Sequence, residues 1–233
     1  MITSPHNDKL KDLRKLAKKR DGRFVAEGED LLDAATSAGW EAVDTFVTPD
    51  AGRAGTVVDP ELLAKASTLG SGTRAIGVYE QRWAEQATGP LVVALWGVGD
   101  PGNVGTILRG ALAFGATSVA LGPGCADPFG PKAVRASMGA IFHVPVTRVQ
   151  TIDALPAPRI ALVARAGAPL QGPLDQATLV VGAERTGLPA EVVAGCEHVA
   201  HLPIAAASES LNAAMAATIA MYEVTKRVNQ PCP

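Results

Sequence analysis

The chain has 233 residues, of which 47% are hydrophobic and 19% charged, and its formal net charge is −2. This composition is typical of a globular protein and excludes an extended disordered chain. No apolar run approaches the ~20 residues that a membrane-spanning helix needs, and the polar N-terminus does not resemble a signal peptide. Three cysteines without ligand-like spacing are typical of a reduced compartment, so we expect a cytoplasmic protein with free thiols.

The small net charge conceals a basic segment at the N-terminus. Residues 1–20 carry a balance of +5, so the rest of the chain sums to −7. Leucines recur at helical spacing from residue 10 onward, which predicts an amphipathic helix capped by Asn7 with cations on its outer face. This face suits a polyanion, although a merely solvated helix would show the same pattern. The cations concerned are Lys9, Lys11, Arg14, Lys15, Lys18 and Lys19.

The first 80 residues predict a small α/β unit. Pro60 suits the first turn of one of its helices. The polar residues 81–90 have no hydrophobic period and end in Gly89-Pro90, which indicates a linker. The predicted strands lie near residues 24–26, 43–47, 57–58 and 73–79, and the predicted helices cover 30–38 and 60–68.

The pattern changes after residue 90. Apolar runs without alternation, separated by helix-length segments, indicate a parallel sheet covered on both faces, and hence an α/β fold. Helices are predicted over 104–114 and from residue 213 to about 228. The runs predicted as strands are 91–96, 119–121, 160–163 and 179–181.

The segment 97–102 matches the G-x-G-x-x-G fingerprint of dinucleotide-binding proteins, between a predicted strand and helix. Asp100-Pro101 places a charge and a ring where a pyrophosphate needs amide donors. The next strand ends in Gly122-Pro123-Gly124, without an acid for a ribose hydroxyl. An NAD-binding Rossmann enzyme is therefore a weaker alternative.

His198 and His201 form a lone H-x-x-H without carboxylate or cysteine partners, and we expect no metal.

Three polar, glycine-punctuated segments lie beside apolar runs, at residues 100–109, 182–189 and 202–212. In this order they resemble the signature motifs of the SpoU-type (TrmH-type) RNA 2′-O-ribose methyltransferases, a branch of the SPOUT superfamily. The resemblance covers nearly the whole chain, but Ala206 replaces a glycine of the third motif. Further matching segments are Phe24–Glu29, Phe114–Ala116, Asp127–Phe129, Lys132, Arg135–Ser137 and Gly139-Ala140.

This resemblance implies a fold and an assembly. Residues 91–233 should form the methyltransferase domain, a parallel sheet containing a deep trefoil knot. Residues 1–80 should form an RNA substrate-binding domain related in fold to small ribosomal proteins, joined through the linker 81–90. Family enzymes are homodimers, so we expect a homodimer.

The resemblance also implies an activity, the transfer of a methyl group from S-adenosylmethionine (SAM) to a ribose 2′-hydroxyl, leaving S-adenosylhomocysteine. Ribosomal RNA is the first choice of substrate and transfer RNA the alternative. A non-catalytic RNA-binding or assembly module is the alternative of another class. The expected catalytic residues are Asn103, Arg109, Glu184, Ser210 and Asn212; those expected to bind SAM are Gly182, Leu202, Ile204 and Leu211; Arg135 joins the basic helix in binding RNA.

Each of these residues also has an ordinary structural explanation. Asn103 is expected to cap the helix 104–114, and Ser210 or Asn212 could simply cap the last helix. Arg109 could be a solvent-facing side chain, and Glu184 a turn carboxylate. Only their joint occurrence in the family's order favours the catalytic interpretation.

Overall fold

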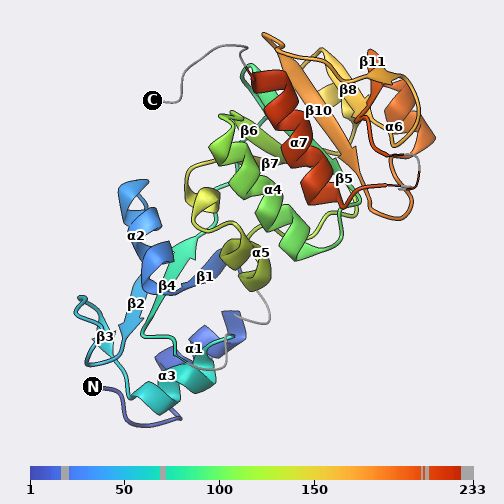
Figure 1. Cartoon of the computed structure of the whole chain (residues 1–233). Coiled ribbons are helices and arrows are strands. Elements are labelled where there is room, and N and C mark those ends of the chain that lie inside the picture. Colours follow the sequence, from blue (N-terminus) through green and yellow to red (C-terminus); the bar gives the residue numbers. More distant parts are fainter. Residues whose placement is uncertain (17–20, 69–71, 206, 208–209, 227–233) are drawn as a thin grey trace.

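A computed structural model gives the protein as two sheets that follow one another along the chain (Figure 1). The structure describes residues 1–16, 21–68, 72–205, 207 and 210–226. Lys18, Lys19 and Ala206, which the sequence analysis singled out, lie outside these residues.

The first sheet contains four strands in the order β1-β4-β2-β3. Strand β4 runs antiparallel to β1 and β2, whereas β2 and β3 are parallel. The sheet and its helices thus form the small α/β unit that the sequence predicts. Their bounds are α1 Asp8–Leu16, β1 Arg23–Glu27, α2 Glu29–Ser37, β2 Asp44–Val47, β3 Thr56–Val57, α3 Pro60–Ala66 and β4 Ala75–Glu80.

Helix α1 is amphipathic as predicted. Leu10, Leu13 and Leu16 are buried, because their spacing places them on one face. The Asn7 side chain accepts a hydrogen bond of 3.0 Å from the backbone N–H of Lys9, which caps the helix. The cations are left on the outer side.

The second sheet contains seven strands in the order β7-β6-β5-β10-β8-β11-β9, and all its pairings are parallel. The predicted α/β class with a parallel sheet is confirmed. Helices α4 and α7 pack against each other on one face of this sheet (Figure 1). The bounds are β5 Leu91–Trp96, α4 Pro101–Ala113, β6 Ser118–Leu121, α5 Pro131–Ala136, β7 Val146–Arg148, β8 Arg159–Leu162, β9 Ala168–Pro169, β10 Ala177–Gly182, α6 Ala190–Ala194, β11 His198–His201 and α7 Ala213–Thr225.

An aromatic cluster joins the two sheets. The ring of Phe24 on β1 lies 4.9 Å from that of Phe129 and 5.8 Å from that of Phe142, between ring centroids. The indole N–H of Trp40 donates a 2.8 Å hydrogen bond to the Phe142 carbonyl. The two units therefore share a hydrophobic core.

Residues 81–90 are attached along the second sheet. The backbone N–H of Ala84 donates to the carbonyl of Val146 at 2.8 Å, and that of Thr88 to the Ser118 hydroxyl at 3.0 Å. Trp83 packs edge-on against Phe129, with 5.0 Å between ring centroids. The segment read as a linker is consequently held in place.

No helix within the described ranges is long and apolar enough to cross a bilayer.

Candidate active site

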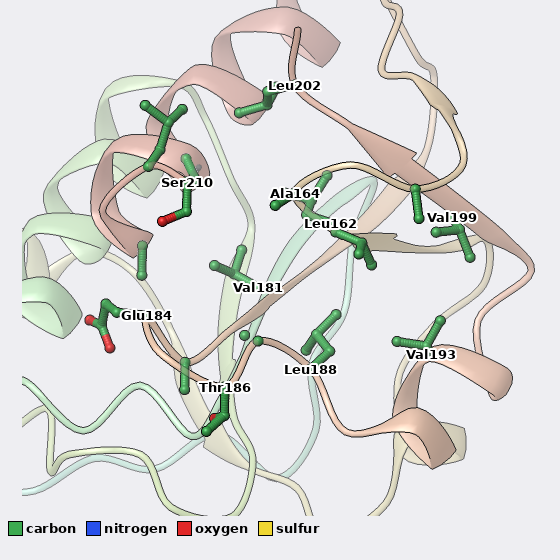
Figure 2. A pocket seen from close by; sticks show the side chains of 18 of the residues that line it. Leu162, Ala164, Val181, Glu184, Thr186, Leu188, Val193, Val199, Leu202 and Ser210 are labelled. Carbon is green, nitrogen blue, oxygen red and sulfur yellow. The ribbon is translucent and has the colours of Figure 1, made fainter. Parts of the chain in front are cut away.

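A cavity of about 740 Å³ lies at the carboxyl edge of the parallel sheet. The ends of β8 and β10 and the turn after β10 contribute to its walls, as do Leu202, Ile204, Ser210, Leu211, Ala213 and Ala216. This is the edge where open α/β sheets bind ligands, and the volume suits a small organic molecule. Figure 2 shows Leu162, Val181, Leu188 and Leu202 around the cavity, with Glu184 and Ser210 at its polar side.

The four residues predicted to bind a cofactor come together here. Gly182, Leu202, Ile204 and Leu211 all line the cavity, although they come from two separate segments. The predicted polar residues Glu184 and Ser210 line it as well, so two of the sequence motifs face one space.

Gly182 has a further structural reason to be glycine. A Cβ atom there would lie 2.4 Å from the carbonyl carbon of Gly187 and 2.5 Å from the backbone nitrogen of Leu188. The turn closes back on Gly182 through two hydrogen bonds between Ala183 and Gly187, of 3.2 and 2.9 Å. A side chain would therefore force open the wall of the cavity.

Sequence reasoning missed part of this lining. Leu162 at the end of β8, Ala164 after it, Leu188 in the turn and Val193 on α6 all face the cavity. Aliphatic side chains carry no chemical signature, so motifs could not identify them. The only available signal was that the run 160–163 would end at the same sheet edge as β10.

Three predicted catalytic residues form one hydrogen-bonded chain beside the cavity. The side-chain amide of Asn103 donates to a carboxylate oxygen of Glu184. The amide of Asn212 donates to the Asn103 side-chain oxygen at 3.1 Å. The Asn212 oxygen in turn accepts from the backbone N–H of Ala214 at 2.9 Å and caps α7. Each of the three motifs thus contributes one member to this chain, which we call the motif cluster: Asn103, Glu184 and Asn212.

The expected helix-capping role of Asn103 is wrong. Helix α4 begins at Pro101, and its cap is Asp100, whose carboxylate accepts the backbone N–H of Asn103 at 3.0 Å. Aspartate is as strong a cap as asparagine, and Pro101 suits the first helical position. A hydrogen bond from Lys132 at 2.8 Å, together with the Asn103 N–H, lowers the pKa of Asp100. The Asn103 side chain is thereby left for the motif cluster.

This cap also removes the basis of the dinucleotide alternative. A bound pyrophosphate would need the free amides at the start of α4, but the Asp100 carboxylate already lies there. Among the described residues, no group of three or more His, Cys, Asp or Glu side chains is placed to hold a metal ion.

Arg109 differs from the motif cluster. It is exposed on α4 and makes no hydrogen bond or ion pair within the described part of the chain. Its planar guanidinium is therefore available to a phosphate or carboxylate. The structure does not link it to Ser210 or Asn212.

The cations predicted to bind RNA have mixed surroundings. Lys9 pairs with Asp44 at 2.6 Å, and Lys11 pairs with Asp8 at 2.9 Å. The guanidinium of Arg14 donates to the Pro5 carbonyl. Lys15 and Arg135 are exposed without a described partner, so they are the most accessible.

The sequence model of the SpoU rRNA Methylase family matches residues 90–222. The chain belongs to this family. It is 30% identical to the 23S rRNA (guanosine(2553)-2′-O)-methyltransferase RlmP of Bacillus subtilis, over 96% of this chain and 98% of that protein. It is 32% identical to an uncharacterised tRNA/rRNA methyltransferase of Synechocystis, over 97% and 93% of the two chains. The AdoMet-bound rRNA methyltransferase of Sinorhizobium meliloti has a similar structure, with a TM-score of 0.84, 30% identity and 95% coverage of both chains.

Proposed function

We propose that this protein transfers a methyl group from SAM to a ribose 2′-hydroxyl of ribosomal RNA. The observation that carries the proposal is the motif cluster, which joins one residue of each motif beside the 740 Å³ cavity. Membership of the SpoU rRNA methylase family and the activity for which the Bacillus relative is named support the same reaction.

The cavity fits SAM. Its aliphatic walls suit an adenine, and the turn at Gly182 brings backbone groups to its edge. Gly182, Leu202, Ile204 and Leu211 would hold the cofactor. When bound, SAM supplies a methyl group already activated on a sulfonium, so no metal is required, and S-adenosylhomocysteine is released.

The acceptor hydroxyl is a weak nucleophile, so it would have to release its proton to solvent water as its oxygen took the methyl group and the neutral thioether departed. The guanidinium of Arg109 binds the RNA phosphate beside the hydroxyl and stabilises the developing negative charge. The motif cluster fixes the loops between which the ribose lies. Ser210, at the polar side of the cavity, completes the site.

The proposal also covers the knot and the roles of the two domains. Residues 91–233 form the methyltransferase domain, and its chain forms the trefoil knot of the SpoU-type enzymes. Membership of the family supports this threading. Residues 1–80 form the RNA-binding domain, related in fold to small ribosomal proteins, and use the basic helix; Arg135 extends this surface. The reaction takes place in the cytoplasm.

A homodimer is also part of the proposal. Large apolar side chains are exposed along neighbouring faces of α4 and α7, which lie side by side (Figure 1). Leu112 is one of these exposed side chains, and it follows Arg109 by three positions on α4. A partner subunit that covers Leu112 would therefore border the guanidinium of Arg109. Sedimentation should show a dimer that Ile219→Lys converts to a monomer, whereas an unchanged mass would reject this face. The exposed residues are Leu112, Met215, Ile219 and Tyr222.

Mapping of 2′-O-methyl groups in total RNA, with and without the gene, tests the reaction. One ribosomal site should lose its methyl group, and purified protein with SAM should restore it. A substrate carrying 2′-deoxyribose at that nucleotide should bind but accept no label, because it lacks the acceptor oxygen. Loss of a transfer RNA site would favour the alternative substrate. Methylation of the deoxy substrate would refute ribose methylation, and loss of no site would favour a non-catalytic RNA-binding module.

A further inference from the structure

A second cavity, of about 590 Å³, lies on the other side of the turn that walls the first. Ala183, Thr186 and Gly187 line both cavities. The turn that separates them is a single stretch of backbone closed by the Ala183–Gly187 hydrogen bonds. A molecule in the second cavity, which we call the flanking groove, would therefore lie one chain thickness from the proposed methyl donor.

The walls of the flanking groove combine apolar residues with hydrogen-bonding groups. Trp96 and Ile152, both buried with 8% of their surface exposed, form apolar wall, while Gln150, Thr151 and Glu191 are exposed around it. Amide, hydroxyl and carboxylate groups beside an apolar wall suit a heterocyclic base, which needs stacking area and partners for its edge.

Part of the wall of the flanking groove is formed by two glycines. Gly97 and Gly124 both line the groove and both have positive φ, of +71° and +77°. A Cβ on Gly124 would lie 3.2 Å from the Cα of Gly97. The loops after β5 and β6 therefore approach each other backbone to backbone, and no side chain covers the space.

A stacked arginine precedes the groove residue Gln150 by two positions, although its own side chain does not line the groove. Arg148 is the last residue of β7, two positions before Gln150, and its guanidinium lies 4.5 Å from the ring centroid of Trp83. Its charge also acts on Cys125, next to Gly124, where it opposes the increase in thiol pKa that burial causes. Arg148 is therefore close to the groove as well as to Trp83.

Arg148 lacks the carboxylate partner that several other arginines of this protein have. Arg23, Arg74 and Arg159 have carboxylate partners. Arg148 is exposed and has no carboxylate partner within the described residues. Stacking on an indole restricts the guanidinium but leaves its in-plane N–H groups free, which is the arrangement that binds a phosphate.

We propose that the flanking groove binds an unpaired RNA nucleotide adjacent to the methylated one, with its base against Trp96 and Gln150 and its phosphate on Arg148. The occupant is a nucleotide because a base-sized space, a free cation and the proposed methyl-transfer site are contiguous. This inference rests on the proposed RNA methyltransferase activity. The flanking groove would recognise the RNA sequence next to the methylated nucleotide, which the cofactor cavity does not contact.

Steady-state methyl transfer tests the groove, with labelled SAM and ribosomal RNA from cells that lack the gene. Thr151→Trp should fill the groove and raise KM for RNA about tenfold. Arg148→Gln should raise KM for RNA severalfold. It should also reduce the slope of log KM against log salt concentration by the amount expected for the loss of about one phosphate contact. Both variants should keep kcat and SAM affinity, because neither side chain lines the first cavity. Ser37→Trp, on α2, controls for added bulk; Arg74→Gln, which removes an arginine already paired with Glu29, controls for lost charge.

The outcomes separate the two proposals. If the wild-type protein methylates RNA and both groove variants have the KM of their controls, the groove does not bind substrate. A loss of SAM affinity in either variant would equally overturn the assignment, since the groove would then belong to the cofactor site. If the wild-type protein transfers no methyl group to RNA, the proposed function fails and the inference fails with it.

Discussion

The two ends of helix α4 carry two kinds of residue. At its N-terminus, Asp100 and Asn103 are engaged with Lys132, Glu184 and Asn212. Further along the same helix, Arg109 is exposed without a described partner. The start of α4 is thus joined to the segments that carry Lys132, Glu184 and Asn212. The guanidinium of Arg109, by contrast, is available to a molecule outside the protein.

This contrast explains why the motif residues cannot share one role. Side chains whose hydrogen bonds are already made inside the protein position the site, because a substrate would have to displace those bonds. A guanidinium without internal partners can bind a substrate without first breaking hydrogen bonds inside the protein. We therefore propose that Asn103, Glu184 and Asn212 position the site and that Arg109 contacts the substrate directly.

The largest effect should follow from Arg109→Ala. Removing the group that contacts the phosphate should lower kcat by about 1,000-fold or more, because the lost stabilisation belongs to the transition state. Calorimetry should show SAM affinity within about threefold of wild type, since such a transition-state contact leaves ground-state binding nearly unchanged. Arg109→Lys should fail almost as completely, because a point charge does not reproduce a planar fork. Substantial turnover by the lysine variant would contradict the proposed contact.

Glu184 should show an intermediate effect that depends on the replacement. Glu184→Ala leaves the Asn103 amide without its acceptor, and the resulting misplacement should lower kcat/KM by about 100-fold. Glu184→Gln retains a carbonyl acceptor, so it should recover most of that loss. Equal losses in the two variants would show that the negative charge itself, and not the hydrogen bond, is what the site requires.

Much of the fold could be predicted because burial leaves a periodic signature. The leucines of α1 and the two-sided apolar runs of β5, β6, β8 and β10 identified those elements to within a few residues. Short elements such as α6 left no such signature. The attachment of residues 81–90 was also invisible, because Trp83 and Ala87 pack individually and not at a regular spacing.

The candidate site was predictable in its members but not in its connections. Asn103 is 81 positions from Glu184 and 109 positions from Asn212, so only the folded sheet brings them into contact. The start of α4 was misplaced because Asp100 and Asn103 are both good caps, and sequence alone does not rank them. The motifs identified Gly182 and Leu202, whereas the aliphatic wall at Leu162 carried no motif.

Asn212 offers a smaller and more discriminating change, because its side chain both caps α7 and donates to Asn103. Asn212→Ala should lower the free energy of unfolding by about 1 kcal/mol through the lost cap, whereas Asn212→Ser should retain nearly all of it. Both remove the bond to Asn103, so both should lower kcat by about tenfold. Denaturant unfolding and initial rates measure the two effects. If serine preserves activity as well as stability, the link to Asn103 is dispensable and Asn212 is only a cap.

The smallest effect should come from the basic helix α1, which lies outside the motif segments. Lys11→Gln with Lys15→Gln should weaken RNA binding and flatten its dependence on salt by roughly 0.7 to 0.9 log units per lost phosphate contact. The ion pair of Lys11 with Asp8 is exposed and weak, so it does not prevent a phosphate from taking the lysine. Turnover at saturating RNA should stay unchanged, unlike that of Arg109→Ala. Lys65→Gln on α3 removes a comparable exposed lysine and serves as the control. A salt slope equal to that of the control would make α1 a solvated surface, and RNA recognition would then rest on the second sheet and its junction.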